Sequence, residues 1–148
     1  MDALELLKQD HQKVKKLLTS ATETEDKNEQ KRLFKEIKTE LEAHARIEET
    51  IFYPAVQEHD ELASLVFESL EEHRQVKTLL RELGRVSPGS DKFKAKLKVL
   101  HDDVEHHAEE EEEGKMFPKV RKAFNSKELG NLGQELEAAK QKRLRKAS

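Results

Sequence analysis

The sequence predicts an all-α protein, an up-down-up-down four-helix bundle with a short extra C-terminal helix. Four long stretches repeat their apolar residues at intervals of three and four, which is the period of an amphipathic helix. No stretch alternates between polar and apolar residues as a half-buried strand does. The connections between the four stretches are short and polar, which favours antiparallel packing of neighbouring helices.

Composition narrows the class of protein further. The 148 residues suit one domain, and 40% charged residues of mixed sign with a net charge of −3 describe a solvated helical surface without the basic excess of a nucleic-acid binder. No apolar run approaches the roughly 18 residues of a membrane span. The amphipathic pattern starts at once, so we expect no signal peptide, no membrane contact and a cytoplasmic location. Because cysteine is absent, any metal must take histidine and carboxylate ligands.

The first helix is expected to begin near Asp2, which forms a capping-box pattern with Glu5. Its inward face reads Leu4, Leu7, His11, Val14 and Leu18. The polar segment 19–28 is expected to connect it to the second helix, which Asp26 can cap. The inward face of that second helix reads Leu33, Ile37, Leu41, His44, Glu48 and Ile51. Pro54 is expected to kink or stop it.

A turn near residue 59 leads to the third helix, and the Gly/Pro/Ser-rich segment 84–90 to the fourth. The inward face of the third helix reads Leu62, Val66, His73, Val76, Leu80 and Leu83. That of the fourth reads Leu97, Leu100, Val104, His107 and Glu111, and Gly114 and Pro118 are expected to end it. Ser126 can cap a last helix from Lys127 to about Lys146. We assign residues 1–125 to the bundle and 126–148 to a C-terminal helix and basic tail packed on it.

The polar residues on these inward faces carry the chemistry. His44 and Glu48 are one helical turn apart, where leucines would be expected. Burying an unpaired carboxylate costs several kcal/mol or more, and a metal ion is the best compensation. One such histidine is usually a satisfied core residue. Here four histidines and two glutamates share the pattern.

The pattern is an internal duplication of a two-helix unit. Between His11 and His44 lie 32 residues, and between His73 and His107 lie 33; each second histidine starts a His-x3-Glu motif. Each motif is followed by an aromatic–proline pair, Tyr53-Pro54 or Phe117-Pro118. Midpoints between successive histidines fall in or near the expected connections, so the four imidazoles should meet at one level of the bundle. Such a set suits two ions, each held by two imidazoles and bridged by both glutamates.

This constellation resembles the hemerythrin-like (HHE cation-binding) domain family, over about residues 2–124. The resemblance implies a four-helix bundle with a non-haem di-iron centre that handles O2 or related small oxidants. It also implies His11, His44, His73 and His107 as terminal ligands, and Glu48 and Glu111 as bridging carboxylates. Nitrogen and oxygen ligands alone would also admit manganese or zinc. Hemerythrins proper have a further histidine one turn after the third-helix histidine, where this chain has Lys77, which favours redox turnover over simple O2 carriage.

Three overlapping pairs compete in the fourth helix. His107–Glu111 continues the apolar face, and Glu111 lies seven residues before Pro118, against six for Glu48 and Pro54. We rank this pair first, His106–Glu110 second and His101–Glu105 last. Tyr53 is either a redox-active or hydrogen-bonding residue near the site or a core residue.

The sequence leads to several functional expectations. We expect a di-iron protein that binds O2, peroxide or nitric oxide; if it is an enzyme, it is a peroxide- or NO-consuming oxidoreductase. The alternative is an iron-binding or sensing protein, or one of metal homeostasis, without turnover. A bundle with a vestigial site is a third reading. We expect a monomer or weak dimer, and the sequence identifies no protein partner.

Overall fold

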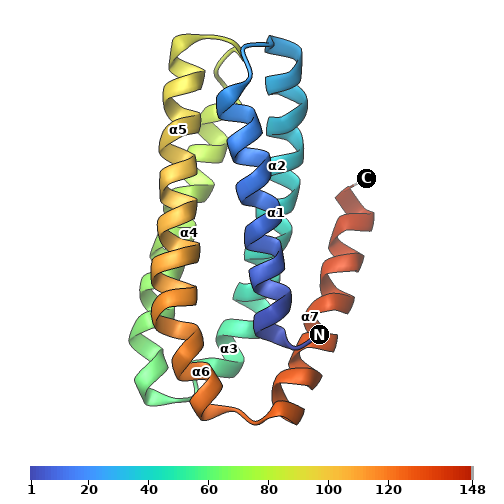
Figure 1. The fold of residues 1–148 in the computed structure, drawn as a ribbon, viewed down its shortest axis with the longest axis vertical. Helices are drawn as coiled ribbons and strands as arrows, with labels where there is room; N and C mark the ends of the chain where they lie inside the picture. Colours follow the sequence, from blue (N-terminus) through green and yellow to red (C-terminus); the bar gives the residue numbers. More distant parts are fainter. Residues whose placement is uncertain (148) are drawn as a thin grey trace.

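Helices account for the fold of this computed structural model, which describes residues 1–147 (Figure 1). The main helices are α1 (Ala3–Glu23), α2 (Lys27–Ile47), α4 (Asp60–Leu83), α5 (Asp91–Glu105) and α7 (Ser126–Ala147). Two π-helices, η1 (Glu48–Phe52) and η2 (His106–Met116), and two short helices, α3 (Tyr53–Val56) and α6 (Phe117–Ala123), continue α2 and α5. Four long helical rods lie side by side, and α7 runs along the outside (Figure 1). The predicted fold class, an all-α four-helix bundle with an extra helix, is confirmed.

Local signals set most helix starts. Asp2 and Glu5 form the reciprocal capping box, and Asp26 accepts from the backbone N–H groups of Asn28 and Glu29. The connection between α1 and α2 is shorter than expected, because α1 continues to Glu23. The cap of α7 is Asn125 rather than Ser126: it exchanges backbone–side-chain hydrogen bonds with Glu128.

The expectation that Gly114 and Pro118 end the fourth helix is wrong, and Pro54, expected to kink or stop the second helix, lies inside α3. An α-helix resists an internal proline because the ring clashes with the carbonyl one turn earlier. Here each proline follows a π-helix, whose wider turns move that carbonyl away. The N–H groups of Tyr53 and Phe117, just before the prolines, donate to the carbonyls of Glu48 and Glu112, five residues earlier. The rods therefore continue past the prolines, and Gly114 lies inside η2.

Two apolar clusters divide the interior. One fills the end of the bundle near α3, α6 and α7, and includes Leu4, Phe52 and Phe117. The other fills the opposite end and includes Leu18, Ile37 and Leu97. The polar inward residues lie between the two clusters, so packed apolar residues support them on both sides.

The C-terminal helix is 22 residues long and so is not short. Its buried residues are Leu129, Leu132, Gly133 and Leu136, and it contacts α1, α2 and η1. It covers one side of the bundle, and the side of α4 and α5 is left without such a cover (Figure 1). The division at residue 125 stays a prediction, and residue 148, the last of the second segment, lies outside the described part of the chain.

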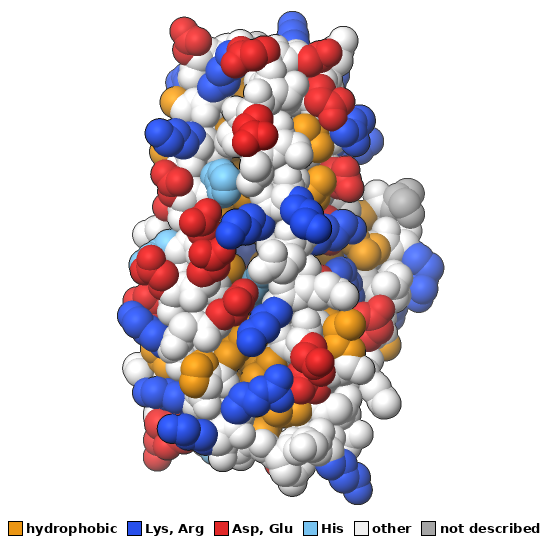
Figure 2. All heavy atoms as spheres, viewed as in Figure 1, with side chains coloured by type: hydrophobic (Ala, Val, Ile, Leu, Met, Phe, Trp, Pro, Cys, Tyr) orange, Lys and Arg blue, Asp and Glu red, His pale blue; other side chains and the backbone are white. Residues whose placement is uncertain are grey.

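The surface carries charges of mixed sign, as the composition predicts. Lysine and arginine are interspersed with aspartate and glutamate over the face seen in Figure 2. Among the described helices, none combines the length and the apolar character needed to cross a bilayer.

Candidate metal centre

Four histidines and two glutamates from different helical rods meet in the middle of the bundle. Each is at most 8% exposed. The six residues are His11 on α1, His44 on α2, Glu48 on η1, His73 on α4, and His107 and Glu112 on η2. The predicted convergence of His11, His44, Glu48, His73 and His107 is therefore what the fold produces.

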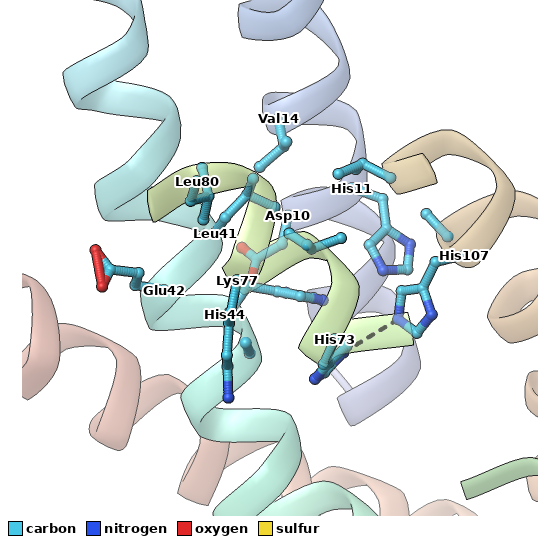
Figure 3. Close-up of a pocket in the computed structure, with 14 residues that line it drawn as sticks. Asp10, His11, Val14, Leu41, Glu42, His44, His73, Lys77, Leu80 and His107 are labelled. Atoms are coloured by element: carbon cyan, nitrogen blue, oxygen red, sulfur yellow. Dashed lines mark hydrogen bonds and ion pairs between the residues drawn. The ribbon is translucent and has the colours of Figure 1, made fainter. Parts of the chain in front are cut away.

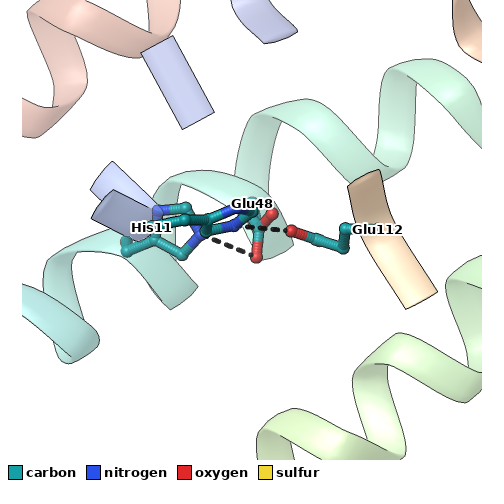
Figure 4. Close-up of side chains that lie close together, drawn as sticks. His11, Glu48 and Glu112 are labelled. Atoms are coloured by element: carbon teal, nitrogen blue, oxygen red, sulfur yellow. Dashed lines mark ion pairs between the residues drawn. The ribbon is translucent and has the colours of Figure 1, made fainter. Parts of the chain in front are cut away.

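The six residues form two groups that share both glutamates. His11 and His44 make one group with Glu48 and Glu112, and His73 and His107 make the other with the same two carboxylates. In the first, His11 Nε2 lies 3.0 Å from Glu112 Oε1 and His44 Nε2 lies 3.3 Å from Glu48 Oε1. In the second, His73 Nε2 lies 3.0 Å from Glu48 Oε1 and His107 Nε2 lies 3.4 Å from Glu112 Oε2. Figure 4 shows the two carboxylates beside the His11 ring.

Several of these atoms are buried without a hydrogen bond. Within residues 1–147 these include His11 Nε2, His44 Nε2, Glu48 Oε2 and Glu112 Oε1. An unsatisfied buried polar atom is costly, so a native cluster of them needs an explanation. Imidazole nitrogens and carboxylate oxygens that converge without bonding one another are a suitable donor set for divalent cations.

A carboxylate stands behind every histidine of the cluster. His11 Nδ1 pairs with Glu113 and His73 Nδ1 with Glu49, at 2.6 and 2.7 Å; each of these glutamates directly follows a shared one. His44 Nδ1 pairs with Asp10 and His107 Nδ1 with Glu72, at 2.9 and 2.6 Å; each of these acids directly precedes a histidine of the cluster. Such pairs fix the ring and the tautomer, so that Nε2 faces the centre as the donor atom.

The carboxylates of the cluster need positive charge beside them. Burial by itself lowers the pKa of His44, but Glu48 and Asp10 outweigh it and raise that pKa to about 10. The pKa of His107 is also well above its ordinary value, because Glu112, Glu48 and Glu72 outweigh burial. Protonated imidazoles therefore balance the carboxylates when no metal is bound. Metal ions would replace those protons with charge of the same sign.

Tyr53 also belongs to this centre. Its hydroxyl donates to the carboxylate of Glu112 and lies 3.1 Å from Glu48 Oε1 and 3.3 Å from His73 Nε2. Burial, together with Glu112 and Glu48, raises the pKa of this phenol well above its usual value. Of the two readings of Tyr53, the structure supports a residue that hydrogen-bonds at the site.

The structure does not bring Glu111 into the cluster; Glu112 stands in its place. Glu111 instead lies near Glu72, His106 and Lys115. The ranking of His107–Glu111 assumed α-helical periodicity, whereas this segment is the π-helix η2. A π-helix has more residues per turn, so residues five apart share a face.

One signal in the sequence identifies Glu112. Glu48 lies six residues before Pro54, and Glu112 lies six before Pro118. Aligning the two halves on the proline rather than on the histidine therefore gives the observed residue. The four backing carboxylates were also missed, although each is next in sequence to a residue of the cluster.

A small cavity opens beside the cluster (Figure 3). It measures about 50 Å³, and all four histidines of the cluster line it. Its apolar wall is formed mainly by Val14, Leu41, Val76, Leu80 and Val104. Lys77, at the position where hemerythrins proper have a histidine, also lines it and pairs with Glu49 at 2.8 Å. Since a cavity of roughly 10–15 Å³ is enough to hold one water, this one suits a molecule of a few atoms.

Comparisons with known proteins agree with this site. The family model of the Hemerythrin HHE cation binding domain matches residues 2–120. A DNA nickase of Nostoc sp. (strain PCC 7120) is 30% identical over 142 residues, which is 96% of this chain but 40% of that protein. The uncharacterized protein Rv2633c of Mycobacterium tuberculosis is 30% identical over 139 residues, covering 93% of this chain and 84% of that one.

A solved structure of similar sequence has the same fold. The crystal structure of an HHE domain-containing homolog of Rv2633c from Mycobacterium kansasii superposes with a TM-score of 0.87 at 29% identity, covering 99% of this chain and 89% of that one. Since the family model spans most of the chain and the cluster lies inside the matched region, the chain belongs to the hemerythrin HHE cation-binding domain family.

Proposed function

We propose that this protein holds two metal ions, most naturally iron, and uses them to bind O2 or a related small oxidant such as peroxide or nitric oxide. The single observation that supports this most is the pair of four-residue groups sharing Glu48 and Glu112. One ion would take His11 and His44, and the other His73 and His107. Two such ions would supply the electrons for a redox reaction with the oxidant.

The protein's own residues perform the remaining tasks. The two shared carboxylates would contribute to holding both ions, and the four backing carboxylates keep each imidazole Nε2 turned toward the centre. The apolar wall of the cavity admits a small neutral molecule and keeps bulk water away from the histidines. The Tyr53 hydroxyl donates to Glu112 and lies 3.1 Å from Glu48 Oε1, and so can hold a proton at the centre.

Metal content with an oxidant titration tests this proposal. Protein loaded anaerobically with Fe²⁺ should retain close to two ions per chain after desalting. Glu48→Ala should lose them, and Glu58→Ala, an exposed glutamate in the turn that follows α3, should not. Wild-type protein that retains no metal would rule out the proposal.

The same preparation separates binding from turnover. A stable spectrum that reverses when O2 is removed indicates carriage or sensing. Rapid loss of peroxide or nitric oxide that Glu48→Ala abolishes indicates an enzyme. Bound iron that responds to none of the three ligands would leave metal handling as the function.

A further inference from the structure

A second set of metal-capable side chains lies on the surface next to the buried centre. One donor atom each from Glu72, His106 and Glu111 lies within 4.8 Å of the others. His106 Nε2 is 3.5 Å from Glu111 Oε1 and 3.7 Å from Glu72 Oε2. These separations are too long for good hydrogen bonds. They are close to the roughly 3.4 Å between ligands that sit about 2.1 Å from one tetrahedral ion.

The π-helix η2 explains why these residues meet. His107 and Glu112, five residues apart, point into the bundle. His106 and Glu111 are also five residues apart and are displaced by one position, so they lie beside that pair and face Glu72 on α4. One π-helical register therefore presents two His/Glu pairs in parallel, one buried and one at the surface.

Two further observations indicate a ligand rather than a chance group of charges. Glu111 is only 5% exposed, and its Oε2 is buried without a hydrogen bond. His106 has the same arrangement as the histidines of the buried centre: Glu110 lies 3.0 Å from its Nδ1, which leaves Nε2 directed at the two carboxylates. The side chain of His106 is 51% exposed, so the group opens to solvent.

We propose that Glu72, His106 and Glu111 form a third metal site, which takes a divalent first-row ion such as Fe²⁺, Mn²⁺ or Zn²⁺ from solution. One imidazole and two carboxylates suit these ions, with water completing the coordination. Glu72 joins this site to the buried centre, because its Oε1 accepts from His107 Nδ1 while Oε2 faces His106. The third ion is therefore one side chain away from a residue of the buried centre.

Lys115 competes with a cation at this site. Its ammonium lies 3.0 Å from Glu111 Oε1, but the side chain is 58% exposed. A divalent ion carries twice the charge of the ammonium and can bind Glu72 and His106 as well as Glu111, so it can displace this half-exposed lysine. Removing this lysine should therefore strengthen the third site, an effect that a merely structural role of Lys115 does not produce.

Equilibrium dialysis against Co²⁺, a spectroscopic probe for such ions, tests the site. At saturation, wild-type protein should bind three ions, His106→Ala two, and His101→Ala three. His101 is the matched control, since it pairs with Glu105 at 3.5 Å but belongs to no such group of donors. Lys115→Met should fill the third site at several-fold lower free Co²⁺ than wild type, whereas unchanged or weaker filling would count against the site.

The outcomes separate this inference from the proposed function. Two ions in wild-type protein, or three retained in His106→Ala, would overturn the third site and leave the buried centre intact. Glu48→Ala should lose the buried ions and keep the third. Loss of all ions in Glu48→Ala would mean that the surface group binds nothing by itself, which would also overturn the inference.

Discussion

The two halves of the duplicated unit each contribute two histidines and one glutamate to the cluster, but in different surroundings. In the first half, Asp10 backs His44 and is 4% exposed, because Lys140 of α7 covers it with an ion pair. In the second half, Glu72 backs His107, and its side chain is 18% exposed and faces His106 at the surface. Thus α7 closes one half and leaves the other open.

The aromatic residues of the two halves differ as well. Tyr53 and Phe117 occupy equivalent positions before the two prolines. The Tyr53 ring lies 5.4 Å from that of His73, and the Phe117 ring lies 6.2 Å from that of His11, between ring centroids. Only the His73 side of this pair therefore receives a hydroxyl. A duplicated scaffold has become chemically asymmetric, and two ions bound in it would not be equivalent.

The largest expected effect concerns a residue that the halves share. Glu112→Ala removes a carboxylate common to both groups, so both buried ions should be weakened more than the roughly 10–100-fold typical of losing an outer partner. Glu111→Ala should leave both buried ions in place and lose only the third. Metal counting on the two variants checks this. Retention of the buried ions in Glu112→Ala, with their loss in Glu111→Ala, would reverse the assignment.

A second prediction concerns the raised histidine pKa values that the halves have in common. The pKa of His44 is raised to about 10 from its ordinary 6.5, so its proton stabilises the metal-free fold. That contribution is fully present below pH 6.5 and is lost as the pH rises through about 10. Metal-free protein should therefore become less stable to urea between pH 7 and pH 10. His44→Gln should flatten part of this slope, whereas a wild-type profile that does not fall would contradict the prediction.

A third prediction separates the halves. Asp10→Asn should weaken the ion at His11 and His44, and Glu72→Gln the ion at His73 and His107, each by roughly 10–100-fold. Asp10→Asn should have the larger effect, because Asp10 is the more buried of the two acids. Each variant is best measured by Co²⁺ titration in two backgrounds, His107→Ala and His11→Ala, each of which disables one half and reports on the other. Equal weakening of both halves by either variant would argue against separate backing.

These tests bear on what the sequence could and could not predict. His11, His44, His73 and His107 follow from helical periodicity, because each occupies an apolar position of a long amphipathic helix. Glu112 does not follow from that periodicity, since π-helical turns place residues five apart on one face; only its spacing to Pro118 identifies it. The expectation that Pro118 ends its helix failed for the same reason. A proline ring clashes inside an α-helix, but the wider turns before Pro54 and Pro118 relieve that clash.

Helical periodicity predicts even less of the pairing between Asp10 and Lys140. The two residues are 130 positions apart, and only the path of α7 across α1 brings them together. A basic residue in a polar helix usually predicts a solvated side chain, whereas that of Lys140 is 13% exposed. The apolar residues of α7 were informative about its packing, but its register against α1 was not contained in them.

A fourth prediction concerns how closely α7 packs on the N-terminus of the chain. A methyl group on Gly133 would lie 2.5 Å from the carbonyl oxygen of Met1 and 2.9 Å from the backbone nitrogen of Ala3, whereas one on Gly130 meets nothing within 4 Å. Gly133→Ala should cost about 1–3 kcal/mol of unfolding free energy, as overpacking does. Gly130→Ala, the matched control, should add up to about 1 kcal/mol by improving helix propensity. Urea denaturation measures both, and equal effects would mean that α7 does not pack closely on the N-terminus.

The smallest expected effect concerns Lys140, whose ion pair covers Asp10 in the first half. Lys140→Met keeps most of the side-chain stem but leaves Asp10 without its ammonium partner, so Asp10 is held less firmly against His44. The ion at His11 and His44 should weaken by up to about tenfold, the lower end of the range for outer partners. Lys140→Arg should restore binding because it keeps the charge and the donors. The same variant should leave the His73 and His107 half unchanged, and a loss shared by both halves would show that α7 stabilises the bundle as a whole rather than one half of its centre.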